Sequence, residues 1–215
     1  MNPDKWRFAT TMRLTLFHTP SSRSLRPLWL LEEMGLDFEL KTITYDAAYF
    51  ASDEYRAINP MGKVPALYDG DNLILESTVI LEYILAKHAP SSLSVKPEES
   101  DFGFYLTWLH MAESGLAHYL AVYLGQLSGL DRYAVSEGFE AYVKYQAEKA
   151  FEMLDNHLIG RSFIAADRFT AADISVGYSL FLASALCGLP LPDRVQGYFE
   201  RLQERPAWKK AVSVK

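Results

Sequence analysis

The sequence predicts an α/β domain followed by an all-helical domain. Short apolar segments with strand character alternate with helical patterns up to residue 88. Beyond residue 98 every periodic segment has the spacing of a helix. Between them, residues 89–98 combine two prolines with small polar residues and break the periodicity, as linkers do. We therefore expect one domain at 12–88, a linker at 89–98 and a helical domain at 99–215.

The first domain is expected to alternate strands with helices. Ser21 and Ser22 are expected to cap its first helix, and Val79, Ile80, Tyr83 and Ile84 to form the buried side of its last one. The expected elements are a strand at 14–17, a helix ending near Gly35, a strand at 38–43, an irregular helix at 46–56, a hairpin of 65–68 with 73–75, and a helix at 76–88. This order, β-α-β-α-β-β-α, is thioredoxin-like.

The second domain is expected to consist of helices only. They are placed at 102–127, 136–158 and 171 to about 186, with two more after Pro192 and Pro206. Thr170 and Asp173 form a capping box at the start of the third, in which each side chain caps the backbone N–H of the other. Such caps stabilise a helix by about 1 kcal/mol each. We therefore interpret this pair as a folding determinant and assign it no chemistry.

Composition indicates an ordinary globular protein in a reducing compartment. The net charge of −6 and the pI near 5.4 make nucleic acid an unexpected partner. Cys187 is the single cysteine, which excludes an internal disulfide and favours the cytoplasm. Neither a signal peptide nor a stretch able to span a bilayer is evident, and His110 and His118 lack the companions of a metal site. Both Met1 and Met12 remain open as the start residue.

The segment Asn59-Pro60-Met61-Gly62-Lys63-Val64-Pro65-Ala66-Leu67 predicts a peptide-binding edge. A proline that opens a strand suits a cis bond, which turns the preceding backbone N–H and C=O toward an extended ligand. One short strand later, Glu76 and Ser77 begin a helix whose free N–H groups and positive dipole end attract a carboxylate. The two features together fit a small acidic peptide.

These motifs, N-P-x-G-K-V-P-A-L followed by D-G and E-S, resemble the glutathione-binding half of the glutathione transferase family. The resemblance implies the two-domain architecture of that family, glutathione as co-substrate, no metal and a homodimer. It implies that the backbone beside Pro65 pairs with the cysteinyl residue of glutathione. It also implies that Glu76 and Ser77 hold the γ-glutamyl end, with Val64 at the strand and Lys63 at the glycyl carboxylate.

A transferase must ionise the glutathione thiol, whose pKa of about 8.5 keeps it protonated at neutral pH. A hydroxyl at a helix N-terminus can donate a hydrogen bond to the thiolate, and Thr19, Ser21, Ser22 and Ser24 are available. Counting back from Gly35 at the end of the first helix, Ser21-Ser22-Arg23-Ser24-Leu25-Arg26 resembles the zeta-class pattern S-S-C-S-x-R. The same count gives the serine of the theta class as Ser21. Ser21 is therefore the first choice, with Thr19 and Ser22 as alternatives. These serines could instead only cap the helix.

Arg23 stands where the zeta pattern has cysteine, which weakens the resemblance to maleylacetoacetate isomerase and removes a protein thiol from the site. An arginine there would add positive charge beside the thiolate, or would only cover the helix surface. The stretch Trp-Leu-His-Met-Ala-Glu resembles the matching helix of a yeast-like bacterial branch of the family. That resemblance implies an electrophile pocket formed by Tyr105, Trp108, Met111 and Ser114, although aromatic residues on a long helix commonly belong to the core.

Two functions follow. The first is a transferase that directs the glutathione thiolate at a hydrophobic electrophile or a peroxide, with peroxidase or reductase side activity. The second is a binding or regulatory module that keeps the fold without turnover. The motifs at Val64, Pro65, Glu76 and Ser77 favour the first, because a purely structural module has no reason to keep ligand-facing groups together. The electrophile itself is left open.

Overall fold

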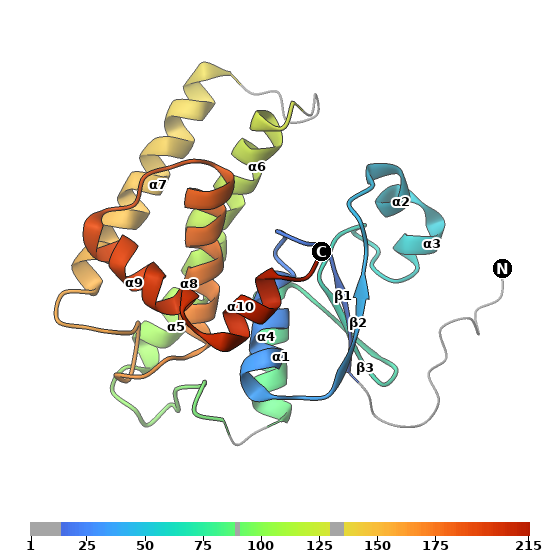
Figure 1. Cartoon of the computed structure of the whole chain (residues 1–215), viewed down its shortest axis with the longest axis horizontal. Coiled ribbons are helices and arrows are strands. Elements are labelled where there is room, and N and C mark those ends of the chain that lie inside the picture. The colour runs from blue at the N-terminus through green and yellow to red at the C-terminus, as the bar shows by residue number, and fades with distance from the viewer. Residues whose placement is uncertain (1–13, 89–90, 130–135) are drawn as a thin grey trace. The chain divides into compact units, whose positions relative to one another are not determined.

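The computed structural model describes residues 14–88, 91–129 and 136–215 (Figure 1). The chain forms two compact units. Among the described residues, one unit contains those before Ser91 together with Pro206–Lys215, and the other contains those of Ser91–Arg205. The first boundary falls inside the predicted linker.

The first unit contains a four-stranded mixed sheet. Its strands are β1 (Leu14–His18), β2 (Phe38–Thr42), β3 (Ala66–Asp69) and β4 (Asn72–Leu75), in the spatial order β2-β1-β3-β4. Strand β1 runs parallel to β2 and antiparallel to β3, and β3 forms a hairpin with β4. The apolar residues of β1 are buried because the strand lies inside the sheet. This arrangement confirms the predicted thioredoxin-like order.

Helices lie at the three predicted places, and the irregular helix predicted at 46–56 is divided into two short helices. In chain order the helices are α1 (Leu25–Met34), α2 (Ala47–Ala51), α3 (Asp53–Arg56) and α4 (Ser77–Lys87). Helix α1 ends at Gly35, which adopts the left-handed conformation that glycine tolerates best. Its N-cap position is held by Ser24, so the predicted caps Ser21 and Ser22 lie in the turn before the helix. The burial predicted for Val79 is wrong: 48% of its surface is exposed, because Ile80 and Ile84 form the inward side of α4.

The last helix, α10 (Pro206–Val212), packs in the first unit instead of the helical domain predicted for 99–215. Trp208 lies against Trp29 of α1, with 4.7 Å between the ring centroids in an edge-to-face arrangement. Lys210 forms an ion pair with Glu32 at 2.6 Å. Both indole rings are buried, and burial of large aromatic surfaces is a strong reason for this helix to join α1.

Apart from an isolated bridge between Ala165 and Arg168, the regular elements described in the second unit are helices. Its α-helices are α5 (Phe102–Met111), α6 (His118–Leu127), α7 (Glu137–His157), α8 (Ala171–Phe181) and α9 (Asp193–Gln203). The predicted helix at 102–127 is interrupted by a π-helical stretch at Ala112–Ala117. A second π-helical stretch, Leu182–Leu186, continues α8. Helix α8 is buried on all sides, and the hydroxyls of Ser175 and Ser179 donate to the carbonyls of Leu109 and Ala112.

The predicted capping box at the start of α8 is confirmed. The fully buried carboxylate of Asp173 accepts hydrogen bonds from Thr170 N–H at 2.8 Å and from Thr170 Oγ1 at 3.0 Å. It also accepts from Ile164 N–H at 3.0 Å and from Tyr198 Oη at 2.9 Å. Burial raises the pKa of Asp173 to about 6. Asp173 therefore joins α8, α9 and the loop before α8.

Arg168 ties the segment that follows the unit boundary to the same loop. Its guanidinium donates to both carboxylate oxygens of Glu99, at 2.7 and 3.0 Å. It also donates to the carbonyls of Ser92 at 2.9 Å and Ser94 at 3.0 Å. A paired, planar guanidinium of this kind fixes orientation as well as position. The described part of the predicted linker is thus anchored to the helical unit.

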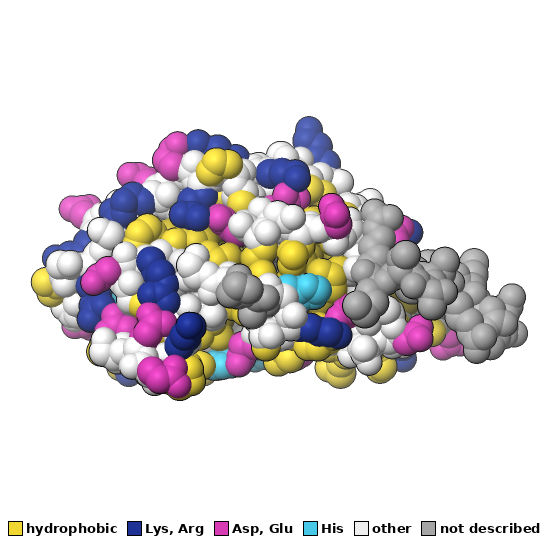
Figure 2. Space-filling view, turned by 90° about the horizontal axis from the view of Figure 1, so that it is seen from below, with side chains coloured by type: hydrophobic (Ala, Val, Ile, Leu, Met, Phe, Trp, Pro, Cys, Tyr) yellow, Lys and Arg dark blue, Asp and Glu magenta, His cyan; other side chains and the backbone are white. Residues whose placement is uncertain are grey.

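Charged side chains of both signs are interspersed on the face shown in Figure 2, where no broad area carries a single sign. Of the helices that the structure describes, none combines the length and the apolar character that crossing a membrane requires.

Candidate functional site

The loop before β3 presents an unpaired stretch of backbone. The Val64–Pro65 peptide bond is cis, as the sequence predicted. The preceding carbonyl, that of Lys63, accepts hydrogen bonds from Tyr55 Oη at 3.0 Å and Asn59 Nδ2 at 2.6 Å. Within the described chain the backbone N–H and C=O of Val64 have no protein partner. An extended ligand could therefore pair with Val64 as an additional strand does.

Gly62 is required for this loop to form. Its φ of +61° lies in the region that favours glycine, and a Cβ atom there would stand 2.4 Å from the carbonyl oxygen of Phe50. The glycine of the G-K-V-P motif is thus explained by backbone geometry.

The N-terminus of α4 is a second polar feature. Glu76 occupies its N-cap position with φ 67° and ψ 124°, a conformation that a residue with a side chain rarely adopts. Ser77 is buried, and its Oγ accepts a hydrogen bond from Nη1 of the buried Arg26 at 3.1 Å. Because a guanidinium only donates, the Ser77 hydroxyl keeps its own proton for another acceptor. A ligand carboxylate at this helix N-terminus would suit that proton.

A cluster of hydroxyl groups lies in the turn between β1 and α1. Ser22 Oγ is 2.7 Å from the carbonyl oxygen of Thr19 and 2.7 Å from Ser24 Oγ. Ser24 Oγ in turn lies 2.7 Å from Nδ1 of His18 and accepts from Thr19 N–H at 3.1 Å. The Thr19 hydroxyl donates to the carbonyl of Ile43 at 2.9 Å. Its proton is therefore already used within the protein.

Ser21 stands outside this cluster. Its side chain is exposed, its φ is 60°, and its hydroxyl has no hydrogen-bond partner among the described residues. Nothing in the described structure fixes the direction of that hydroxyl.

The strand register brings the cis-proline loop, the hydroxyl cluster and the start of α4 to the same end of the sheet. Phe17 pairs with Ala66, so the carboxyl end of β1 lies beside the amino end of β3. Ala66 also pairs with Leu75, so the end of β4 and the start of α4 lie at that same end of the sheet. The hydrogen bond between Arg26 and Ser77 then joins the first turn of α1 to the first turn of α4. The cis-proline loop, the hydroxyl cluster and the helix N-terminus are therefore neighbours, and the adjoining Lys63 and Glu76 are exposed.

Known proteins carry the same organisation. The model of the glutathione S-transferase N-terminal domain matches residues 12–86, and that of the glutathione S-transferase C-terminal domain matches residues 132–209. Glutathione S-transferase 3 of Schizosaccharomyces pombe is 30% identical over 79% of this chain and 74% of its own length. The chain belongs to the glutathione S-transferase family. Glutathione S-transferase 3 of Zea mays is likewise 30% identical, over 93% of both chains.

Solved structures of the family agree with the fold of this transferase. A sphingomonad glutathione S-transferase complexed with glutathione superposes with a TM-score of 0.77 and 27% identity. The superposition covers 92% of this chain and 96% of that one.

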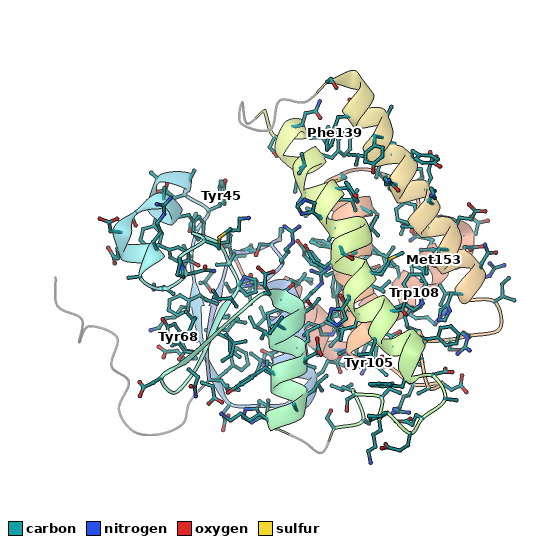
Figure 3. The ribbon with its side chains drawn as sticks, turned by 180° about the vertical axis from the view of Figure 1, so that it is seen from behind. Tyr45, Tyr68, Tyr105, Trp108, Phe139 and Met153 are labelled. Atoms are coloured by element: carbon teal, nitrogen blue, oxygen red, sulfur yellow. The ribbon has the colours of Figure 1, made fainter. Side chains whose placement is uncertain are left out.

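The residues expected to form the electrophile pocket lie in different surroundings. Tyr105 and Trp108 of α5 are buried in the helical unit, at 4% and 3% exposure (Figure 3). Trp108 and the half-buried Met111 line an interior cavity of about 10 Å³, too small for an organic substrate. Ser114 is exposed, and its hydroxyl donates to the carbonyl of His110. Tyr105 and Trp108 thus serve the core here, and a pocket wall formed by all four stays a prediction.

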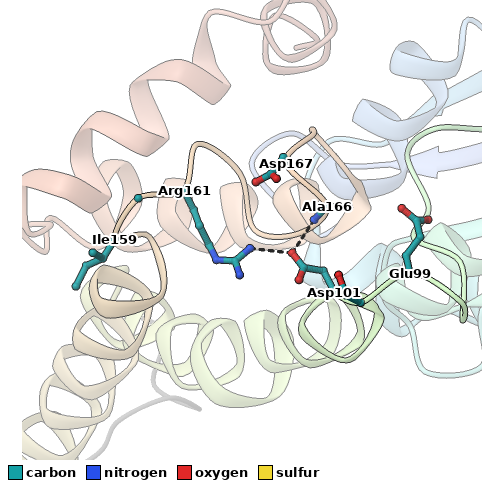
Figure 4. A pocket seen from close by; sticks show the side chains of 8 residues that line it. Glu99, Asp101, Ile159, Arg161, Ala166 and Asp167 are labelled. Carbon is teal, nitrogen blue, oxygen red and sulfur yellow. Dashed lines mark hydrogen bonds and ion pairs between the residues drawn. The ribbon is translucent and has the colours of Figure 1, made fainter.

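A larger, polar pocket of about 590 Å³ lies in the helical unit, and none of the residues that line it is a predicted site residue (Figure 4). Asp101 lines this pocket, and its carboxylate accepts hydrogen bonds from Arg161 Nη1 at 2.8 Å and from Ala166 N–H at 2.9 Å. These two hydrogen bonds lower the pKa of Asp101, the bond from Ala166 first. The arrangement holds the loop at Ala166 and Asp167, both of which have positive φ angles. We assign this pocket a structural role.

Sequence reasoning missed two supporting residues, Arg26 and His18. Arg26 is fully buried and contacts Ser77, 51 positions away in the chain. His18 is the last residue of the apolar strand β1. A histidine at the end of an apolar strand was the signal in the sequence that could have identified it. Cys187, by contrast, is buried in the helical unit, and burial raises the pKa of its thiol to about 11.

Proposed function

We propose that this glutathione transferase binds reduced glutathione along the edge formed by the cis-proline loop and α4. The transferase would ionise the thiol at the start of α1 and direct it at a hydrophobic electrophile or a peroxide. The convergence of an unpaired Val64 backbone, the α4 N-terminus and a hydroxyl cluster at one end of the sheet carries this proposal. The sphingomonad relative complexed with glutathione supports it.

Each feature has one task in this proposal. The Val64 backbone, held beside Pro65, pairs with the cysteinyl residue of glutathione. Ser77 and Glu76 at the start of α4 bind the γ-glutamyl end, where the helix dipole favours a carboxylate. The exposed Lys63 pairs with the glycyl carboxylate. Arg23 adds positive charge near the thiolate.

The thiolate then requires a hydroxyl donor. Thr19 is buried and donates its proton to Ile43, whereas Ser22 is half-buried and Ser21 is exposed, so these two serines are the remaining choices from the sequence prediction. Proximity supplies the rest of the catalysis, since a bound thiolate beside a bound electrophile reacts as in one molecule. Tyr105 and Trp108 are buried, so they are poor candidates for contact with the electrophile. Ser114 and Met111, the other two residues of the predicted electrophile pocket, are more accessible.

Ser77→Ala is expected to weaken glutathione binding about tenfold, because it removes one charge-assisted hydrogen bond of roughly 1.5 kcal/mol. Turnover at saturating glutathione should change less than about twofold, since the lost contact is equal in the ground and transition states. Isothermal titration calorimetry and steady-state kinetics give the two numbers. Ser128→Ala, at an exposed position in the other unit, is the matched control. Unchanged affinity in Ser77→Ala would remove Ser77 from the site.

Turnover separates the transferase from a module without catalysis. We expect the protein to be retained on immobilised glutathione and to conjugate a generic aryl halide or reduce an organic hydroperoxide. Retention without turnover of any electrophile or peroxide would instead support a binding or regulatory role. We further propose a cytoplasmic homodimer, in line with the single cysteine and the commonness of two-fold assemblies. Light scattering that finds a monomer at working concentration would contradict the dimer.

A further inference from the structure

His18 is a polar residue in an apolar place. It ends β1, its side chain is 1% exposed, and its Nε2 has no hydrogen-bond partner among the described residues. Burial lowers the pKa of His18 to about 4, so the ring is neutral at physiological pH. A buried imidazole with one unpartnered nitrogen is costly. The contact between its Nδ1 and Ser24 Oγ at 2.7 Å therefore calls for an explanation.

The hydrogen-bond pattern gives that contact a direction. Ser24 Oγ already accepts from Thr19 N–H, and a hydroxyl has one proton and two acceptor positions. If His18 carries its proton on Nε2, Ser24 must donate to Nδ1, and the 2.7 Å contact between Ser22 and Ser24 then takes the Ser22 proton away from the carbonyl of Thr19. If His18 carries its proton on Nδ1, it donates to Ser24, and Ser22 donates to the carbonyl of Thr19 at 2.7 Å. Ser24 then donates to Ser22 at 2.7 Å, a shorter contact than its 3.3 Å approach to the carbonyl of Thr19.

The second tautomer fits the buried surroundings better. It leaves Nε2 as a bare acceptor, whereas the first leaves a buried N–H without a partner. Orphaned N–H groups are the rarer of the two in folded proteins.

We propose that His18, in its Nδ1–H tautomer, is a positioning residue that directs a donor chain through Ser24 to Ser22, whose hydroxyl then donates to the glutathione sulfur. This inference rests on the proposed function and selects Ser22 over Ser21 as the thiol contact. Hydrogen bonds in such a chain polarise one another, so each donor strengthens the next. In the absence of glutathione the Ser22 proton is satisfied by the carbonyl of Thr19, 2.7 Å away. Ligand binding would turn that proton from the carbonyl to the thiolate.

The tautomer is measured directly on the unmodified protein. Nitrogen-15 NMR correlation spectra of the histidine rings distinguish protonation at Nδ1 from protonation at Nε2, and no ligand is needed. His18→Asn supplies the assignment, because its spectrum lacks the His18 signals. We expect the Nδ1–H pattern for His18. The Nε2–H pattern would overturn the proposal, whatever the protein does with glutathione.

Two variants then test the donor. His18→Leu removes it, and His18→Asn places an amide N–H close to the position of Nδ1. For His18→Leu we expect the pKa of the bound glutathione thiol to rise by about one unit, with kcat/KM falling about tenfold near neutral pH. Glutathione affinity should stay within about twofold. His18→Asn should recover most of both losses.

Equal thiol pKa values in the two variants and the unmodified protein would overturn the role of His18, because a purely structural residue would not affect that pKa selectively. If His18→Leu fails to fold, Ser24→Ala breaks the same chain and is expected to give the same rise in thiol pKa. Failure of the unmodified protein to bind glutathione would contradict the proposed function instead. The calorimetric and NMR results therefore distinguish the two failures.

Discussion

Replacing Ser22 by Ala is expected to lower kcat/KM for an aryl halide about 30-fold near neutral pH. A charge-assisted hydrogen bond to a thiolate is worth about 2 kcal/mol, which corresponds to that factor. The pKa of the bound thiol should rise by about 1.5 units, toward the value of about 8.5 for a free thiol. Glutathione binding should change much less, because the lost contact is made chiefly to the ionised form. Steady-state kinetics over a range of pH measure both quantities.

Ser21→Ala is the matched control, one residue away and identical in chemistry. Ser21 is exposed and outside the hydroxyl cluster, so we expect its loss to change kcat/KM by less than about threefold. The reverse ranking would restore Ser21, the residue favoured by counting from Gly35, as the thiol contact. It would also contradict a donor chain that ends at Ser22.

The second large effect concerns the stability of the helical unit. Asp173→Ala is expected to reduce the free energy of unfolding by about 4 kcal/mol, because it strands buried donors that cost 1–3 kcal/mol each. Those donors are the backbone N–H groups of Ile164 and Thr170 and the hydroxyls of Thr170 and Tyr198. Thermal unfolding followed by circular dichroism should show a fall in Tm of about 10 °C.

Asp193→Ala, at an exposed position in the first turn of α9 in the same unit, is the control for Asp173→Ala. It removes a carboxylate without stranding a buried donor, so its effect should stay near 0.5 kcal/mol. A loss of less than about 1 kcal/mol in Asp173→Ala would show that the capping box contributes little to the stability of the fold.

Local patterns were sufficient for most of the fold. The capping box at Thr170 and Asp173, the cis bond at Val64 and Pro65, and the order of strands and helices along the first domain all follow from residues close in sequence. The resemblance to the family rested on those same segments, and the comparisons confirm the family.

Long-range packing explains what local patterns could not supply. The place of α10 depends on Trp208 meeting Trp29, about 180 positions earlier in the chain, which no periodicity encodes. The exposure of Val79 depends on which side of α4 meets α1. The support of Ser77 by Arg26 also requires two helix N-termini to meet.

The order of preference among the hydroxyls shows the same limit. Counting back from Gly35 favoured Ser21, but the helix begins at Leu25, and Ser24 occupies the N-cap position. The bond between Ser24 and His18 is a consequence of how the turn after β1 folds back on the strand. Spacing alone does not report that turn, so the preference for Ser21 over Ser22 stays a prediction.

The claim on which the account depends is that the start of α1 stabilises the glutathione thiolate. Titrating the ultraviolet absorbance of the thiolate, with glutathione bound to the unmodified protein, measures the pKa of that thiol directly. We predict a value at least about one unit below the 8.5 or so of a free thiol. Glutathione that binds, as shown by calorimetry, and titrates at its solution value would contradict the account.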